Sequence, residues 1–147
     1  MMNTLEIEKI LGAISPHFAG VYARNKLPTC RLRVPCLMVC NTDPDTKQGQ
    51  HWIAVYIDKE RHGEYFDPYG IPPFHFDFID FLKRQCKTWS YNHIRVQPLN
   101  SLTCGQYCIY YLVHREMGMT MRDITENLDS STYLVDDFVQ KLVHYLP

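Results

Sequence analysis

The stretch from Gln97 to Leu112 constrains the fold more than any other part of the sequence, because a polar loop there runs directly into an apolar segment. Thr103 and Gln106 have the spacing of a capping box, in which an N-cap hydroxyl is followed three residues later by an amide. The spacing predicts that a helix begins at Cys104. A helix N-terminus carries partial positive charge and unpaired N–H groups, and both favour a thiolate.

Cys104 is therefore a candidate nucleophile. Gly105 leaves the approach to its sulfur open because glycine has no side chain, and Gln97 lies seven residues upstream with an amide that can donate beside the thiol. A backbone N–H and a side-chain amide are the donors of an oxyanion hole. The alternative is a buried cysteine that begins a core helix, and this stretch alone favours neither interpretation.

A second candidate pair comes from a predicted β-hairpin. Residues 51–58 are rich in β-branched and aromatic side chains and predict a strand, which a turn at 59–63 connects to a returning strand at 64–67. His51 and Asp67 then lie at the same open end of the hairpin, where the carboxylate can accept a hydrogen bond from the imidazole. A rim histidine and a turn-capping aspartate are the alternatives, and the pair gains its interest from the candidate nucleophile and amide.

Hydrophobic periodicity and turn residues predict the remaining elements. Asn3 caps the first helix with Glu6 at its third position, and Leu5 shares the buried face of that helix. In chain order we expect a helix at 3–14, a loop at 15–29, a strand at 32–40, a helix at 74–87 with Phe74 on its buried side, a strand at 92–96, a helix from 104 to about 117, a capping-box helix at 120–128 and a helix at 133–145. No repeat or linker-like segment divides the chain, so we expect a single domain over residues 1–147.

Composition narrows the class of protein. The 147 residues include six cysteines but no C-x-x-C pair, so we expect reduced thiols and no structural metal site. The first thirty residues mix charged and apolar side chains, and no apolar run is long enough to span a membrane, so we expect an intracellular protein that is not secreted. A formal net charge of −1 argues against a general surface for polyanions such as nucleic acid.

The candidate residues occur in an order that resembles a known family. His51-Trp52 begins one strand, Asp67-Pro68-Tyr69-Gly70 ends the next, and Gln97 precedes Cys104-Gly105. This order is similar to that of the adenovirus-type cysteine endopeptidases (adenain) and their relatives, the SUMO- and ubiquitin-like-protein-specific proteases. The interval between Gln97 and Cys104, the Pro98 and Asn100-Ser101 run, and the segment from Phe18 to Tyr22 look closer to the adenovirus branch, and the resemblance covers most of residues 1–117.

The resemblance implies an α+β, papain-like fold in the adenain and SUMO-protease arrangement, with a central, mostly antiparallel sheet flanked by helices. It implies that Cys104, His51 and Asp67 form a catalytic triad and that Gln97 completes the oxyanion hole. Trp52 would shield one side of His51, and Asn100 would shape the loop before the cysteine. The implied activity is cleavage of extended polypeptides beside small residues such as glycine, in precursor proteins of a virus or a Polinton-type element, within the host nucleus or cytoplasm or the virion.

The sequence also departs from the adenovirus pattern. Asp67 stands where the adenovirus enzyme has a glutamate, although the sister families use aspartate, and the chain is short for an adenovirus protease. The adenovirus enzyme is activated by DNA and by a viral peptide that can attach through a disulfide. The sequence itself requires no cofactor, its net charge does not support DNA activation, and no cysteine matches the attachment position.

Two alternatives stay open on the sequence, and so does the oligomeric state. One is an isopeptidase specific for SUMO or ubiquitin-like proteins, which has the same chemistry and other substrates. The other is a catalytically silent module that keeps the fold and binds extended peptides.

Overall fold

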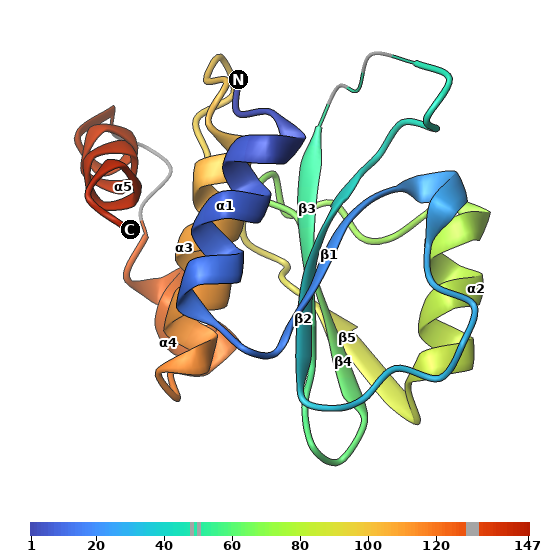
Figure 1. The fold of residues 1–147 in the computed structure, drawn as a ribbon. Coiled ribbons are helices and arrows are strands. Elements are labelled where there is room, and N and C mark those ends of the chain that lie inside the picture. Colours follow the sequence, from blue (N-terminus) through green and yellow to red (C-terminus); the bar gives the residue numbers. More distant parts are fainter. Residues whose placement is uncertain (48, 50, 129–132) are drawn as a thin grey trace.

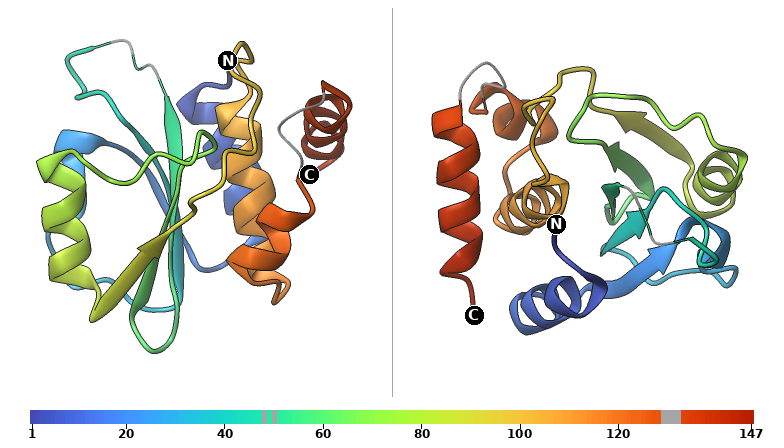
Figure 2. Two further views of the ribbon diagram at one scale, coloured as in Figure 1. Left: turned by 180° about the vertical axis from the view of Figure 1, so that it is seen from behind. Right: turned by 90° about the horizontal axis from the view of Figure 1, so that it is seen from above.

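The computed structural model describes residues 1–47, 49, 51–128 and 133–147. In these residues a five-stranded sheet lies between two unequal layers of helices: α1, α3, α4 and α5 are on one side and α2 is on the other (Figures 1 and 2). The elements in chain order are α1 (Thr4–Ile14), β1 (Phe18–Ala23), the 3-10 turn η1 (Arg24–Lys26), β2 (Cys36–Asn41), β3 (Trp52–Ile57), β4 (His62–Phe66), α2 (Phe76–Gln85), β5 (Thr88–Tyr91), α3 (Cys104–Glu116), α4 (Met121–Glu126) and α5 (Tyr133–His144). The expected α+β class is confirmed.

The sheet has the strand order β1-β2-β3-β4-β5 and is mixed. β3 is antiparallel to both of its neighbours, whereas the β1–β2 and β4–β5 pairs are parallel. Parallel neighbours require a crossover connection, which η1 and the following loop supply between β1 and β2, and α2 supplies between β4 and β5. The expectation of a mostly antiparallel sheet therefore holds only for the central strands.

The central strands are buried on both faces. Ile53, Val55 and Ile57 of β3 pack toward α2, together with Phe78 and Leu82 of that helix. The alternate residues of the same strand join a larger core around α3. Burial on both faces explains why this segment is almost continuously apolar in the sequence.

Local signals at helix ends are confirmed in most cases. The Asn3 side chain accepts a hydrogen bond from the Glu6 N–H at the start of α1, and a reciprocal capping box between Thr120 and Asp123 begins α4. The buried face of α1 differs from the prediction: Leu5 is 75% exposed, and Ile7 is buried instead. The two positions are two residues apart and so lie on nearly opposite sides of a helix.

Three further predictions are corrected. The expected loop at 15–29 contains β1, which is parallel to β2 at the sheet edge. The last strand occupies Thr88–Tyr91 instead of residues 92–96. The second helix begins at Phe76, so Phe74 lies outside it and is 77% exposed.

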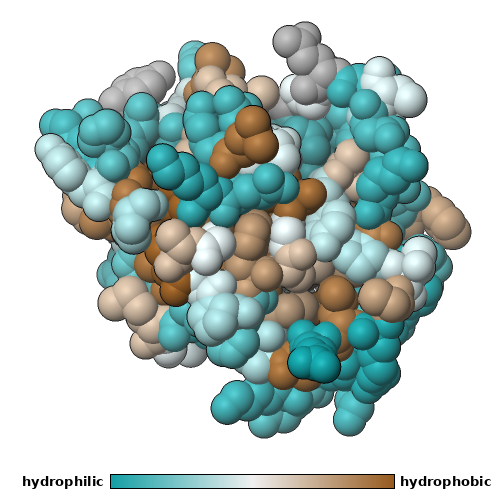
Figure 3. Space-filling model, in the orientation of Figure 1, coloured by the Kyte–Doolittle hydropathy of each residue, from teal (hydrophilic) through white to brown (hydrophobic). Residues whose placement is uncertain are grey.

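Figure 3 shows one face of the molecule, coloured by hydropathy. On the face drawn in Figure 3, hydrophobic residues gather toward the middle and hydrophilic residues toward the edges. Among the described residues, no helix combines the length and apolar character needed to cross a bilayer. All six cysteines lie at described positions and are free thiols, and Cys108 is fully buried in the core beneath α3's first turn.

Candidate active site

His51 and Asp67 meet at the open end of the β3–β4 hairpin. His51 directly precedes β3, and Asp67 directly follows β4. Nε2 of His51 lies 2.7 Å from Oδ1 of Asp67, and the aspartate is only 4% exposed. The structure therefore brings this predicted pair together in a base–orienter arrangement, in which a carboxylate fixes the orientation of an imidazole.

Backbone and amide groups hold the Asp67 carboxylate in place. The Tyr69 N–H donates to Oδ1 at 2.8 Å, within the tight turn that the following proline and Gly70 form. The Asn92 side chain accepts from the Asp67 N–H at 2.8 Å and donates to the Asp67 carbonyl at 2.6 Å. Asn92 is a residue that the sequence reasoning missed, because that reasoning placed it inside a strand, whereas it follows β5 and bonds across to the turn.

Tyr69 adds a contact that the strand register explains. Ala54 pairs with Phe66 and Ile57 pairs with Gly63, so the same register carried outward places His51 opposite residue 69. The two rings stack with their centroids 4.9 Å apart and their planes 18° from parallel. Tyr69 therefore packs against the His51 ring, a role that was expected of Trp52 from the sequence.

Cys104 begins α3 and lies at the same end of the sheet as His51 and Asp67. Its side chain is almost buried, at 2% exposed for the residue, and its sulfur accepts a hydrogen bond from the Trp52 N–H at 3.4 Å. α3 packs along β3, so the start of the helix lies beside the start of the strand that follows His51. The N-terminal end of α3 places its partial positive charge at the sulfur.

The electrostatics of His51 reflect both neighbours. Burial lowers the pKa of the imidazole, but hydrogen bonds to Asp67 and to Cys104, together with the charges of these two groups, outweigh burial and raise it from 6.5 to about 9. An imidazole between a carboxylate and a thiol is thus held in its protonated form at neutral pH.

Gln97 lies in the loop that leads to Cys104 and is 1% exposed. The N–H groups of Val96 and Gln97 both donate to the Pro68 carbonyl, at 2.8 and 3.0 Å, which fixes this segment beside the Asp67 turn. The Gln97 amide nitrogen donates to the Ser101 carbonyl at 2.8 Å and to the Tyr69 hydroxyl at 3.4 Å, and its Oε1 has no hydrogen-bond partner among the described residues. The bond to Tyr69 is the longer and weaker of the two, so a stronger acceptor can take that N–H.

The predicted capping box at the start of α3 is absent from the described residues. Thr103 is the N-cap, but its side chain makes no cap hydrogen bond there and instead donates to Oδ1 of Asp136 at 2.5 Å. The Ser101 hydroxyl donates to the same oxygen at 3.0 Å. Asp136 lies in the first turn of α5 and is buried, and the sequence offered no sign that it ties this loop to the last helix.

The three supporting residues have different surroundings. Trp52 is buried, and its indole N–H donates to the Met2 carbonyl at 2.9 Å. A side chain on Gly105 would approach Trp52 and Met2 closely, so the glycine keeps this corner open. Asn100 is exposed, and its side chain makes no hydrogen bond to any residue that the structure describes, so nothing here links it to the shape of the loop.

No group of three or more His, Cys, Asp or Glu side chains suited to a metal ion occurs within residues 1–47, 49, 51–128 and 133–147. The candidate site itself contains a thiol, an imidazole, a carboxylate and hydrogen-bond donors. These are the groups of a nucleophilic cysteine site.

Sequence comparison agrees with this geometry. The chain is 29% identical to a protease of bovine adenovirus 4 over 116 residues, and 27% identical to a protease of bovine adenovirus B serotype 3 over 132 residues. The chain resembles adenovirus proteases. The aligned regions cover 69% and 80% of the chain but 54% and 60% of the two viral proteins, so the chain spans little more than half the length of these relatives. No protein-family model matches it.

Solved structures share the fold. The ASFV pS273R protease matches 99% of this chain and 67% of its own, with a TM-score of 0.69 and 20% identity. The central domain of the uncharacterized Lpg1148 protein from Legionella pneumophila matches the whole chain with a TM-score of 0.50 and 15% identity. The resemblance to the adenovirus-type proteases and the fold that it implies are therefore confirmed.

Proposed function

We propose that the chain is a cysteine endopeptidase that uses Cys104 as nucleophile, His51 as general acid and base, and Asp67 to orient the imidazole. The observation that carries this proposal is the position of His51, whose ring lies 2.7 Å from the Asp67 carboxylate and whose pKa both Asp67 and Cys104 raise. The similarity to viral proteins named proteases supports the same reaction.

The reaction follows from these positions. The Cys104 thiolate attacks the carbonyl carbon of a peptide bond, and the negative charge moves to the carbonyl oxygen. The Cys104 N–H donates to that oxygen, and so does the Gln97 N–H that otherwise donates weakly to the Tyr69 hydroxyl. Removal of one such donor costs roughly 100- to 1000-fold in rate. When the C–N bond breaks, His51 gives its proton to the leaving amine and a thioester remains. His51 then removes a proton from water, whose attack releases the new carboxylate and restores the thiol.

We expect an extended substrate with glycine or another small residue beside the scissile bond. The space beside Cys104 is narrow at Gly105, because Cδ1 of Trp52 lies 3.2 Å from the place that a Gly105 Cβ would occupy. The similarity to viral proteases favours viral or virus-like precursor proteins as substrates. A ubiquitin-like tail that ends in glycine also fits the narrow space beside Cys104. Activation by DNA is tested by measuring cleavage with and without it.

The test compares Cys104→Ala with Cys30→Ser, which alters an exposed cysteine away from the site. A glycine-containing peptide library and a ubiquitin-like protein with a Gly-Gly tail serve as substrates, each with and without DNA. The parent chain and Cys30→Ser should cleave at equal rates, and Cys104→Ala should lose cleavage and labelling by a peptide vinyl sulfone. Cleavage that survives in Cys104→Ala would exclude the proposed nucleophile.

A further inference from the structure

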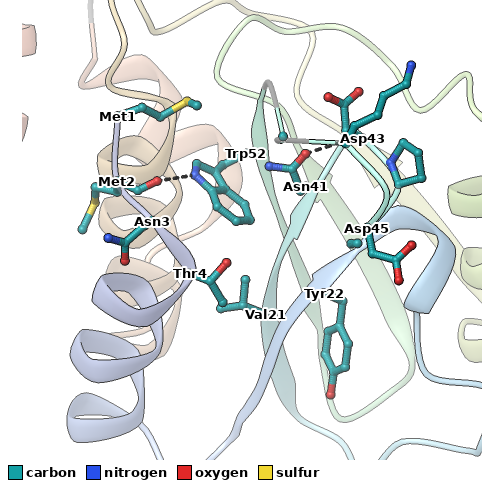
Figure 4. Close-up of a pocket in the computed structure, with 14 residues that line it drawn as sticks. Met1, Met2, Asn3, Thr4, Val21, Tyr22, Asn41, Asp43, Asp45 and Trp52 are labelled. Carbon is teal, nitrogen blue, oxygen red and sulfur yellow. Dashed lines mark hydrogen bonds between the residues drawn. The ribbon is translucent and has the colours of Figure 1, made fainter.

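The first residues of the chain lie across the corner that holds Cys104. The Met2 carbonyl accepts the hydrogen bond from the Trp52 indole at 2.9 Å (Figure 4). Sδ of Met1 lies 3.9 Å from Sγ of Cys104. A polar donor thus meets a main-chain carbonyl while an unbranched side chain covers the sulfur. These two contacts are of the kind that a protease makes with a bound polypeptide.

Gly105 provides the space for this arrangement. A Cβ built on this residue would lie 3.1 Å from Cβ of Met2 and 3.2 Å from Cδ1 of Trp52, both closer than ordinary packing allows. The glycine lies within α3 and has no positive φ that would require it. Its lack of a side chain is therefore explained by the chain segment that passes over it.

The position of the segment is fixed from α1. Ile7 and Leu11 bury α1 against the core, and the Asn3 side chain caps the helix by accepting from the Glu6 N–H at 2.9 Å. Asn3 itself is extended, with φ −100° and ψ 171°, so the chain leaves the helix and turns toward Trp52. The helix holds residues 1–3 near Cys104 at high effective concentration.

Cavities lie on both sides of this segment. One, of about 670 Å³, is lined by Met1, Met2, Asn41, Asp43 and Trp52 among others, and Figure 4 shows it between the start of α1 and the end of β2. The other, of about 370 Å³, lies against the loop before Cys104 and is lined by Ser101, Thr103 and Asp136. Met1 borders both cavities, so it stands between them.

We infer that the two cavities are parts of one groove that binds an extended polypeptide, and that residues 1–3 occupy the centre of this groove as a substrate would. The inference rests on the proposed function, because the groove takes its meaning from Cys104 as nucleophile. The Trp52 indole donates to a main-chain carbonyl of whichever polypeptide is bound. A substrate must therefore displace residues 1–3, and its apparent affinity falls by the fraction of molecules in which the segment is bound.

The experiment measures how readily the Cys104 thiol is reached. A chain that begins at Asn3, released from a cleaved N-terminal fusion, is compared with the full chain released in the same way. Iodoacetamide alkylation of Cys104 is followed by peptide mass mapping, and the exposed Cys30 in the same samples is the internal control. We expect Cys104 to react about tenfold faster in the shortened chain, since one net hydrogen bond corresponds to roughly fivefold and the Met1 contact adds to it.

Trp52→Phe in the full chain gives a second measurement that does not depend on the stability of the shortened chain. It removes the indole N–H and keeps an aromatic ring, so alkylation of Cys104 should again be faster while Cys30 is unchanged. A synthetic Met-Met-Asn-Thr peptide at millimolar concentration should slow alkylation of the shortened chain. Equal Cys104 rates in the full chain, the shortened chain and Trp52→Phe would overturn the inference.

Peptide cleavage separates this inference from the proposed function. A shortened chain that cleaves peptides with a lower KM and an unchanged kcat supports both. Faster alkylation of Cys104 in a chain that cleaves nothing would overturn the endopeptidase and leave the occupied groove. Peptide cleavage together with equal alkylation of Cys104 in the full and shortened chains would support the endopeptidase and overturn the occupied groove.

Discussion

Oγ1 of Thr103 donates a hydrogen bond to Oδ1 of Asp136 at 2.5 Å, which joins the residue before the candidate nucleophile to α5, 33 positions further along the chain. The Ser101 hydroxyl donates to the same oxygen, and the Ser101 carbonyl in turn accepts from the Gln97 amide. The orientation of the candidate oxyanion donor therefore depends on a carboxylate in the last helix. The first turn of α5 stabilises that charge through the helix dipole.

Substitution of Asp136 should lower both stability and turnover. Asp136→Ala leaves the buried Thr103 hydroxyl and the half-buried Ser101 hydroxyl without their charged acceptor, so we expect the free energy of unfolding in urea to fall by about 3 kcal/mol. We expect kcat to fall because the Gln97 amide loses its fixed position, and KM to rise because Asp136 lines part of the proposed groove. Asp136→Asn keeps an acceptor oxygen and should recover most of both losses. Asp137→Ala, which alters the exposed neighbour paired with Lys141, is the control and should change neither.

The raised pKa of His51 predicts an alkaline limit to activity. The pKa in the folded chain is about 9, above 6.5, so the imidazolium persists at neutral pH and is lost as pH rises through about 9. The contribution of the protonated His51 to the free energy of unfolding is accordingly complete below pH 6.5, and it is lost as pH rises from 6.5 through about 9. kcat/KM should fall above pH 9 in the parent chain. In Asp67→Asn the fall should occur at lower pH, because the charge that raises the His51 pKa is gone, and an unmoved limit would contradict this role for Asp67.

Loss of the Gln97 amide should affect the chemical step. Gln97→Ala should lower kcat roughly 100- to 1000-fold with little change in KM, because the N–H that donates weakly to the Tyr69 hydroxyl moves to the substrate oxygen when negative charge develops there. Leu99→Ala, in the same loop but 69% exposed and outside the lining of the proposed groove, is the control and should change the rate by no more than about twofold. Equal losses in the two variants, measured by steady-state kinetics, would mean that the loop acts only through its shape.

Short-range signals in the sequence predicted much of this structure. The Asn3 cap, the Thr120 capping box and the strand of residues 52–57 each depend on neighbours a few residues away or on burial that the strand's own composition reveals. The same is true of the hairpin that brings His51 to Asp67, since a short turn fixes which strand ends meet. The four predicted site residues accordingly lie in one region of the fold.

The failures depend on partners that are distant in sequence. β1 is partly exposed along its whole length and has no alternation to reveal it, and its pairing with β2 alone makes it a strand. Thr103 has the local spacing of a cap, but Asp136 outcompetes the cap bond. Asn92 and the N-terminal segment meet the site only after the sheet and α1 have packed, so no local pattern indicates them.

A last prediction concerns what holds the two halves of the site together. Glu64 of β4 accepts from Nε of Arg115 at 2.7 Å and from the Tyr111 hydroxyl at 2.5 Å, and both donors belong to α3. Glu64 is 8% exposed, so its charge depends on this pairing. β4 ends directly before Asp67 and α3 begins at Cys104, so the ion pair joins the element that leads to the carboxylate with the helix that carries the sulfur.

Arg115→Ala should therefore cost about 3–5 kcal/mol of unfolding free energy, because it leaves a buried carboxylate without its cation. Glu64→Gln in the same chain removes that charge and should restore a large part of the loss, which a double-mutant cycle in urea measures. Arg122→Ala, which breaks the exposed pair with Glu126, is the matched control and should leave stability nearly unchanged. If the double variant is no more stable than Arg115→Ala, the loss comes from the packing of the arginine over the Tyr56 ring, 4.5 Å away, and the buried charge has no part in it.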